Sequence, residues 1–251
     1  MIEVKNISKT FGDTQILYDV SFTFEKGKTN LIIGQSGSGK SVLTKCIVGL
    51  HKPEIGQILF NGRDMVTINN REKKNVRKEI GMLFQGSALF DSLTVMENVM
   101  YPLTMFTKMT KAQMKERAKF CLDRVDIIGK DNLYPSEISG GMQKRVAIAR
   151  AISMKPEYLF CDEPNSGLDP KTSILIDELI KDLTEEYQMT TVVITHDMNS
   201  VLEIGDNIMF IYKGHNHWTG NKESILTTKN EEVVDFVYSS KFMKMYREKI
   251  I

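Results

Sequence analysis

Residues 34–41 read Gly34-Gln35-Ser36-Gly37-Ser38-Gly39-Lys40-Ser41, and this stretch decides the fold. It fits the pattern G-x-x-x-x-G-K-[ST], whose glycines let successive backbone N–H groups converge on phosphate oxygens at the start of a helix. The apolar run 31–33 precedes it and a helical segment from Lys40 to Gly49 follows it, so the required strand, loop and helix are present. The pattern predicts a nucleotide site in which Lys40 reaches the β- and γ-phosphates and the Ser41 hydroxyl coordinates magnesium.

A second strand pattern ends in carboxylates. Residues 158–163 form an apolar run that closes with Asp162 and Glu163. These carboxylates suit a magnesium-organising Asp162 and a water-polarising Glu163 in phosphoryl transfer. Taken alone, the stretch fits an ordinary strand-to-loop boundary almost as well, but behind a phosphate loop it favours catalysis. His196 follows another apolar run, at the sheet edge where ligands bind in open α/β folds, although a lone histidine is more often structural.

The composition is that of an ordinary globular chain. Its 251 residues suffice for one large domain, or for a domain with a subdomain. Because 33 Lys and Arg stand against 32 Asp and Glu, there is no basic field, and nucleic acid is not expected as a partner. The N-terminus lacks the basic and apolar regions of a signal peptide, and no apolar run approaches the roughly 20 residues that cross a bilayer. We therefore expect a cytoplasmic location.

Cysteines and histidines give little sign of a metal framework. Cys46, Cys121 and Cys161 are odd in number, widely spaced and set in apolar segments, which predicts reduced core thiols. His215 and His217 form a possible metal pair. No cysteine or carboxylate stands beside them at ligand spacing, so a surface loop is the favoured interpretation.

The pattern along the chain predicts an α/β protein with a mostly parallel core sheet. The first sixty residues alternate as strands, and Asn61-Gly62 suits a tight hairpin, which indicates an N-terminal antiparallel β subdomain. Residues 94–153 have a helical pattern, which indicates a helical subdomain at about 86–155. Strand patterns return later, separated by a helix that begins at Asp169 and Pro170 and runs to about Glu186. The returning strands are expected at residues 158–161, 191–195 and 208–212.

The main domain is expected to span 1–230 and to be followed by a tail at 231–251. An amphipathic helix begins at Glu231, and a basic stretch follows it. The tail fits either a dimer or partner contact, or a solvated end. Its basic residues are Lys241, Lys244, Arg247 and Lys249.

Six segments, taken in order, closely resemble the nucleotide-binding subunit of ATP-binding cassette (ABC) transporters from about Ile2 to Lys222. The resemblance implies a P-loop NTPase fold and an ATPase that uses ATP and Mg²⁺. It also implies a head-to-tail dimer, because in that family the Ser-Gly-Gly segment of one copy completes the ATP site of the other. Separate permease subunits would bind the helical subdomain. The six segments are Gly34 to Ser41, Gln85, Ser139-Gly140-Gly141, Asp162-Glu163, Ser166 to Asp169, and His196.

The resemblance implies further roles, residue by residue. Phe11 matches the aromatic residue that stacks on adenine, with Ile16 as a lesser contact, although a core phenylalanine is the alternative. Gln85 matches the glutamine that touches magnesium or the attacking water and senses the transport subunit. Asp169 matches the residue that couples the two sites, and His196 the one that senses the γ-phosphate.

The Ser-Gly-Gly segment, residues 139–141, has both a functional and a local interpretation. Ser139 and Gly141 would contact the γ-phosphate of the opposite site through a hydroxyl and a backbone N–H, with Gly140 between them. Ser139 could instead be only a helix N-cap. The two roles are compatible, since a capped helix start still leaves free N–H groups.

Residues 81–99 are similar to the corresponding stretch in ATPase subunits of Mla-type phospholipid transporters, which work with MCE-domain lipid-binding proteins. Met142, where the wider family has glutamine, indicates the same subfamily. The alternatives are ordinary packing for Ala88, Leu89 and Phe90, and a tolerated substitution for Met142. We expect a phospholipid transport ATPase held by its permease on the inner face of the bacterial cytoplasmic membrane. A solute importer, a lipoprotein-releasing complex or a cell-division complex would use the same ATPase motifs.

Overall fold

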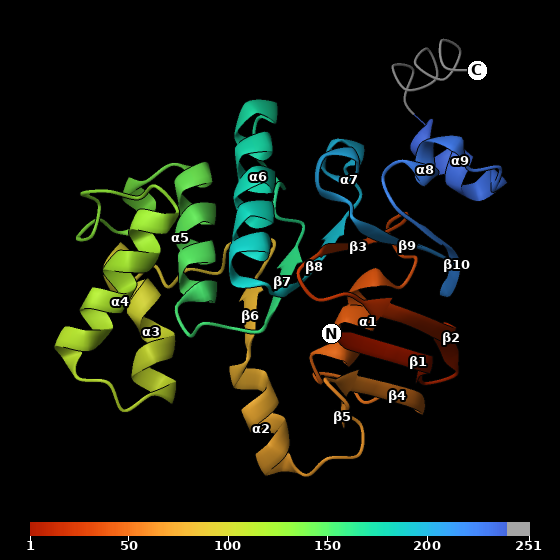
Figure 1. The fold of residues 1–251 in the computed structure, drawn as a ribbon, viewed down its shortest axis with the longest axis horizontal. Coiled ribbons are helices and arrows are strands. Elements are labelled where there is room, and N and C mark those ends of the chain that lie inside the picture. The colour runs from red at the N-terminus through yellow and green to blue at the C-terminus, as the bar shows by residue number, and fades with distance from the viewer. Residues whose placement is uncertain (240–251) are drawn as a thin grey trace. The chain divides into compact units, whose positions relative to one another are not determined.

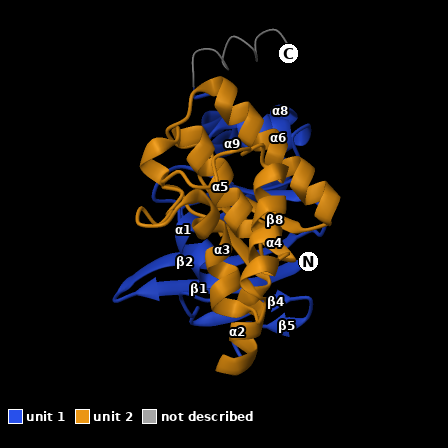
Figure 2. Ribbon diagram, turned by 90° about the vertical axis from the view of Figure 1, so that its left-hand side faces the viewer, with its two compact units in different colours: residues 1–68, 194–251 blue, residues 69–193 orange. Residues whose placement is uncertain are grey.

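The computed structural model describes residues 1–239, which divide into two compact units. Unit 1 comprises residues 1–68 together with the chain from 194 onward, and unit 2 comprises residues 69–193 (Figure 2). Within residues 1–239, no helix has the length and apolar character needed to cross a bilayer.

The first sheet of unit 1 is antiparallel. Its strands are β1 (Ile2–Phe11), β2 (Thr14–Phe24), β4 (Ile55–Phe60) and β5 (Arg63–Asp64), in the order β2-β1-β4-β5 (Figure 1). Ile2 lies opposite both Phe24 and Phe60, and all three side chains are fully buried. Asn61 and Gly62 both have a positive φ, 46° and 81°, as a tight primed turn requires. The predicted antiparallel layer and hairpin are confirmed.

The second part of unit 1 supplies the parallel strands that position the phosphate loop. β3 (Thr29–Ile33) is buried throughout and pairs in parallel with β9 (Asn207–Tyr212), which pairs antiparallel with β10 (His215–Gly220). Trp218, the single tryptophan of the sequence, lies in β10. The helices of this unit are α1 (Lys40–Ile47), α7 (Met198–Ile204), α8 (Ser224–Thr227) and α9 (Glu231–Val237).

Unit 2 combines strands with most of the helices. β6 (Ile80–Leu83) pairs in parallel with β7 (Tyr158–Asp162), whose other neighbour is β8 (Thr190–Thr195), the strand that returns the chain to unit 1. Its helical elements are α2 (Asn70–Lys78), α3 (Val95–Phe106), α4 (Lys111–Arg124), a 3₁₀ turn (Pro135–Glu137), α5 (Gly140–Ile152) and α6 (Pro170–Tyr187). The helices α3, α4 and α5 pack on one another, and α5 also packs on β6 and α6.

Helix caps account for where several helices begin. Thr94 and Thr110 each form a complete capping box, with Glu97 and Gln113. Asp169 caps α6 by accepting a hydrogen bond from the Thr172 N–H at 3.0 Å. The helix that begins after Asp169 is therefore confirmed. The parallel pairing of β3 with β9 and of β6 with β7 confirms the α/β class with parallel core strands.

The cysteines are core thiols, as expected. Cys46, Cys121 and Cys161 are all buried and free. Burial raises the pKa of Cys46 and of Cys121 to about 11, because a thiolate is poorly solvated in an apolar environment.

The expected surface loop at His215 and His217 needs correction, and the basic residues of the tail lie outside the described residues. His215 and His217 are exposed but stand in strand β10 and not in a surface loop. His217 Nε2 lies 3.0 Å from a Glu232 carboxylate oxygen on α9, so the strand is tied to the predicted C-terminal helix. The basic residues Lys241, Lys244, Arg247 and Lys249 lie outside the described residues.

Candidate functional site

The phosphate loop, residues 34–41, requires glycine at its first and last glycine positions. Gly34 and Gly39 have φ of 145° and 109°, which residues with a Cβ rarely adopt. A Cβ at Gly34 would lie 2.3 Å from the Ile211 carbonyl oxygen, and one at Gly39 would lie 2.9 Å from Leu17 Cδ2. The loop therefore packs closely against the rest of unit 1 at Gly34 and Gly39, while its middle, Gln35 to Gly37, is exposed.

Lys40 and Ser38 give this loop its chemistry. The Lys40 side chain is 8% exposed, and its Nζ donates to the carbonyl oxygens of Gly34 at 2.6 Å and Gln35 at 2.9 Å. Its ammonium therefore lies inside the curve of the loop. The Ser38 hydroxyl is buried and has no hydrogen-bond partner among the described residues. A buried cation, an unsatisfied hydroxyl and a glycine cradle at the start of α1 fit the phosphates of a nucleotide. Ser41, exposed in the first turn of α1, is available as a magnesium ligand.

Phe11, Ile16 and His196 also belong to unit 1. The Phe11 ring is 43% exposed, so the alternative of a core phenylalanine is wrong. Lys9 Nζ lies 4.9 Å from the centroid of this ring, and the His51 ring meets it edge-on at 5.2 Å. Ile16 is half-buried beside the phosphate loop's neighbour Leu17, and His196 is exposed just after β8. These positions leave the predicted adenine and γ-phosphate contacts accessible.

Unit 2 brings Gln85, Asp162 and Glu163 to one sheet edge. β6 and β7 are parallel, with Leu83 opposite Cys161, so Gln85 and Glu163 each stand two residues beyond the same pair. Carboxyl ends of parallel strands are where α/β folds bind ligands. Gln85 Nε2 lies 3.5 Å from Ser166 Oγ, in the segment that follows Glu163. The carboxylate of Asp162 and the amide of Gln85 are oxygen ligands of the kind that Mg²⁺ prefers.

The Ser-Gly-Gly segment opens helix α5. Ser139 is the N-cap, and its Oγ accepts a hydrogen bond from the Met142 N–H at 3.3 Å. The capping interpretation of Ser139 is therefore confirmed. A Cβ on Gly141 would lie 2.7 Å from Thr172 Cγ2, so glycine is required for the close approach to α6. Ser139, Gly140 and Asp169 line one hollow of about 280 Å³.

Asp169 is held at the rim of this hollow by the start of α6. Its carboxylate accepts from the Thr172 hydroxyl at 2.5 Å as well as from the Thr172 N–H. The hydrogen bonds from the Thr172 hydroxyl and N–H lower the pKa of Asp169, since they favour its charged form. Two segments that the sequence predicted separately, residues 139–141 and Asp169, thus meet in unit 2.

Lys144 on α5 contacts two of the predicted site segments, and sequence reasoning missed it. Its side chain is buried, and its Nζ donates to the Gln85 carbonyl oxygen. A signal was present, because Lys144 shares the helical spacing of Ala147, Ile148 and Ala151, all of them buried. A lysine at a core position of an apolar helix face calls for a buried partner.

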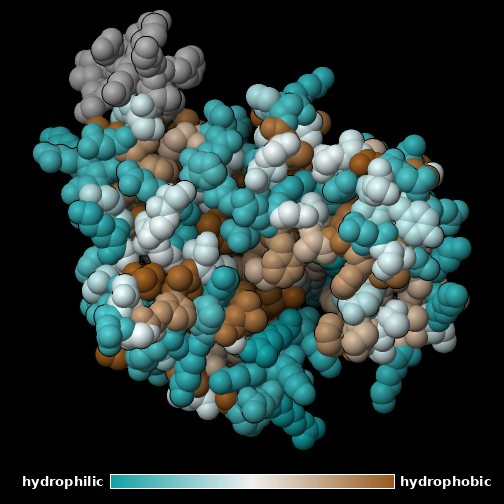
Figure 3. Space-filling model, turned by 180° about the vertical axis from the view of Figure 1, so that it is seen from behind, coloured by the Kyte–Doolittle hydropathy of each residue, from teal (hydrophilic) through white to brown (hydrophobic). Residues whose placement is uncertain are grey.

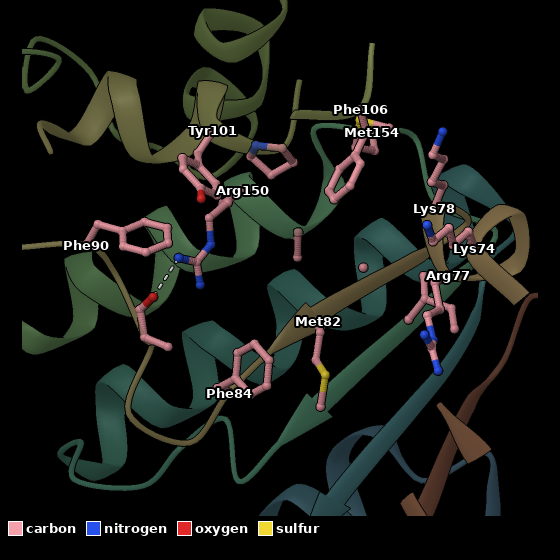
Figure 4. A pocket seen from close by; sticks show the side chains of 15 residues that line it. Lys74, Arg77, Lys78, Met82, Phe84, Phe90, Tyr101, Phe106, Arg150 and Met154 are labelled. Carbon is pink, nitrogen blue, oxygen red and sulfur yellow. Dashed lines mark hydrogen bonds between the residues drawn. The ribbon is translucent and has the colours of Figure 1, made fainter. Parts of the chain in front are cut away.

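The surface of unit 2 also carries a groove of about 790 Å³. Figure 4 shows aromatic and apolar side chains from β6, the segment after it and α3 on one side, and the basic side chains of α2 on the other. Arg150 supports the floor by donating to the carbonyl oxygens of Ala88 at 2.7 Å and Ser87 at 2.8 Å. Figure 3 shows hydrophobic side chains gathered round a hollow on one face of the molecule. The main side chains that line the groove are Lys74, Arg77, Lys78, Met82, Phe84, Phe90, Tyr101, Phe106 and Met154.

Comparison with known sequences places these features in a family. The model of the family described as "ABC transporter" matches residues 17–166, which include the phosphate loop, the Ser-Gly-Gly segment and Glu163. The intermembrane phospholipid transport system ATP-binding protein MlaF of Haemophilus influenzae is 39% identical over 94% of this chain and 90% of its own length. The methionine import ATP-binding protein MetN of Clostridioides difficile is 39% identical over 90% of this chain and 70% of its own.

A mycobacterial relative is matched over a smaller share of its length. The probable ribonucleotide transport ATP-binding protein mkl of Mycobacterium leprae is 36% identical over 94% of this chain, which spans 68% of that relative. This chain spans 66% of the length of the Mycobacterium tuberculosis H37Rv protein of the same name.

Solved structures agree with the sequence comparison. The ATP-binding cassette MJ0796, solved as a dimer in a post-hydrolysis state bound to ADP and phosphate, has 33% identity and a TM-score of 0.80 over 88% of this chain and 99% of its own. The cbiO1 protein of Clostridium perfringens has a TM-score of 0.85 at 27% identity over the whole chain. The chain therefore belongs to the ABC transporter family and is an ATPase subunit of that family, with ATP and Mg²⁺ as its cofactors.

Proposed function

We propose that this ATPase powers phospholipid transport through a separate membrane permease. The observation that carries the proposal is the match with the phospholipid transport ATP-binding protein of H. influenzae, which covers 94% of this chain and 90% of that relative at 39% identity. The methionine import relative is equally similar but is matched over only 70% of its length. The stretch 81–99 and Met142 support the same cargo class.

ATP with Mg²⁺, when bound, supplies the γ-phosphoryl group that is transferred to water. In the proposed arrangement, the N–H groups of residues 34–41 and the Lys40 ammonium hold the phosphates. Ser41, Asp162 and Gln85 supply oxygen ligands for the metal. Glu163 orients the attacking water and accepts its proton, and His196 senses the γ-phosphate.

The remaining site residues act at adenine and in the partner copy. Phe11 stacks on the base, with Ile16 beside it. Ser139 and Gly141 of one copy complete the nucleotide site of a second copy bound head to tail, and Asp169 couples the two sites. The exposed start of α5 supports this assignment, because the N-terminus of a helix favours anions. The dimeric structures of the MJ0796 cassette support a second copy as partner.

The groove of unit 2 is the surface that we assign to the permease. Its apolar side chains include Phe90 and Tyr101, whose ring centroids lie 4.5 Å apart, and its other side is basic through Lys74, Arg77 and Lys78. An apolar floor with a basic side suits an amphipathic segment that carries acidic residues. The permease would hold the chain on the inner face of the bacterial cytoplasmic membrane, and an MCE-domain lipid-binding protein would complete the transporter.

Purification of the chain from membranes of its own source, with identification of co-purifying subunits and lipid, tests this function. We expect a permease, an MCE-domain protein and bound phospholipid. A permease of the methionine import class without phospholipid would contradict the lipid assignment while leaving the ATPase intact. Substitution of Phe90 by Glu, on the apolar side, should release the permease, whereas Lys111→Glu, at an exposed position of α4, should not.

A further inference from the structure

Lys144 is a buried lysine of unit 2. Lys144 is on α5, three residues after Gly141, and is only 4% exposed. A buried lysine is unfavourable unless its donors are satisfied. Burial lowers the pKa of Lys144, while the nearby carboxylates of Asp162 and Glu163 act against this shift.

The ammonium reaches the backbone of two segments that carry predicted site residues. Nζ donates to the carbonyl oxygen of Gln85 and lies 3.5 Å from that of Glu163. Gln85 follows β6 and Glu163 follows β7, so Lys144 bridges the ends of two paired strands. Both acceptors are main-chain oxygens. Lys144 therefore acts on the path of the main chain at Gln85 and Glu163.

The backbone of Glu163 needs such support. Its φ is 48°, in the left-handed region that residues with a Cβ avoid. The Glu163 carbonyl also accepts a hydrogen bond from the Ser166 N–H at 3.1 Å, and Ser166 Oγ lies 3.5 Å from Gln85 Nε2. One set of hydrogen bonds thus connects Lys144, Gln85, Glu163 and Ser166.

Helix α5 connects this set to the Ser-Gly-Gly segment. Lys144 lies about 6 Å along the helix axis from Gly140, at the 1.5 Å rise per residue of an α-helix. A shift of α5 would therefore move the ammonium, and with it the backbone of Gln85 and Glu163. The helix start that we assign to the second copy's nucleotide is thus linked through Lys144 to the backbone of Gln85 and Glu163.

We propose that Lys144 is a positioning residue for ATP hydrolysis, which fixes the backbone of Glu163 and Gln85 relative to α5. The proposal rests on the hydrolytic role assigned to Glu163 above. Lys144 touches no reacting atom in this scheme. Its loss should therefore lower kcat and leave KM for ATP nearly unchanged, because the phosphate loop lies in a different part of the chain.

Steady-state ATPase kinetics of the full chain in its purified membrane complex test the proposal. We expect Lys144→Met to lower kcat by 10- to 100-fold, as misplacement of reacting groups by about 1 Å does, with KM within about twofold of wild type. Lys144→Arg should restore kcat to within about threefold, since a guanidinium can reach the same carbonyls. Lys144→Gln should fall between Arg and Met, because an amide donates more weakly than a cation.

Arg117→Met is the matched control. Arg117 on α4 also donates to two carbonyl oxygens, those of Ser153 at 2.9 Å and Ile152 at 2.8 Å. The kcat of the Arg117→Met variant should stay within about twofold of wild type, even if the variant unfolds at a lower temperature. An equal loss of kcat in Arg117→Met and Lys144→Met would show a general structural effect and overturn the proposal.

Several other kinetic results would overturn the proposed role of Lys144. A Lys144→Met complex with wild-type kcat, or with a raised KM at unchanged kcat, overturns the proposal. If Lys144→Met does not fold, a wild-type kcat in Lys144→Gln has the same meaning. Glu163→Gln, measured in parallel, should hydrolyse ATP at least about 100-fold more slowly and trap an ATP-bound dimer. Full activity in that variant refutes the role of Glu163, whereas inactivity there with an active Lys144→Met refutes only the role of Lys144.

Discussion

The phosphate loop and the Ser-Gly-Gly segment both place glycines at the start of a helix, but they use glycine for different reasons. Gly34 and Gly39 have φ values of 145° and 109°, and a Cβ on either would strike a neighbouring atom. Gly140 and Gly141 open α5 without a positive φ, and only Gly141 is crowded, by Thr172. The first loop needs glycine for its conformation, and the second needs it for approach. Substitutions should therefore add backbone strain to a steric clash in the first loop, and cause a steric clash alone at Gly141 in the second.

Gly34→Ala should have the largest effect. The new Cβ would lie 2.3 Å from the Ile211 carbonyl oxygen on a backbone that alanine does not adopt. We expect ATP binding to be abolished and the free energy of unfolding to fall by about 3 kcal/mol or more. Denaturant unfolding and titration with a fluorescent ATP analogue measure both.

Gly37→Ala is the control for Gly34→Ala within the same loop. Gly37 also has a positive φ, 79°, but no atom lies within 4 Å of the position of its Cβ. We expect a cost of about 1 kcal/mol, from the backbone conformation alone. Equal losses in the two variants would refute the role of the close packing around Gly34.

Mixed dimers that combine Lys40→Met and Ser139→Arg test the assignment of residues 139–141 to the opposite site. If the dimer is head to tail, both substitutions in one copy disable both sites, because Lys40 belongs to one site and Ser139 to the other. Divided between two copies, they disable the same site and leave one intact. ATPase rates of the two purified mixed complexes should differ by at least about tenfold. The reverse order of rates would rule out the head-to-tail arrangement.

Gly141→Ala should have a smaller effect, because it introduces a steric clash with α6 but no backbone strain. Its Cβ would lie 2.7 Å from Thr172 Cγ2, so we expect a destabilisation of about 1–2 kcal/mol. Gly140→Ala meets no atom closer than 3.9 Å and should change stability by less than about 0.5 kcal/mol. Chemical denaturation of the two variants distinguishes them. A Gly140→Ala variant as unstable as Gly141→Ala would contradict the packing argument.

The smallest expected effect is the pH dependence of the Asp169 cap. Hydrogen bonds from Thr172 lower the pKa of Asp169 from its ordinary value of 3.8. Because the folded pKa lies below the unfolded one, the cap's contribution is fully present above about pH 4 and is lost as the pH falls through the folded value. The difference in thermal unfolding between wild type and Asp169→Asn should therefore shrink between pH 7 and pH 3. Asp182→Asn, on the exposed side of the same helix, controls for the removal of a charge.

Local sequence patterns predicted the parts of the fold and of the site that depend on adjacent residues. The phosphate loop, the carboxylates after β7 and the cap at Asp169 each depend on a few consecutive residues and a regular spacing. The polar strand β10 and helix α2 were missed. α2 has a single buried side chain, Val76, so it has little apolar periodicity to detect.

Tertiary contacts explain what the sequence could not supply at the site. The bridge from Lys144 to Gln85 joins residues 59 positions apart, and the left-handed backbone of Glu163 has no local glycine signal. Likewise, the crowding of Gly141 depends on Thr172, which lies on another helix. The residue types could be predicted, but the partners that hold them in place could not.

Trp218 gives the chain an intrinsic fluorophore that reports on one unit alone. It is the single tryptophan and lies in β10 of unit 1, whereas Cys121 and Cys161 are buried in unit 2. Tryptophan emission and the thiol reactivity of these two cysteines therefore follow the unfolding of different units. Coincident denaturation curves would show that the two units unfold cooperatively, and separated curves would give each unit its own stability.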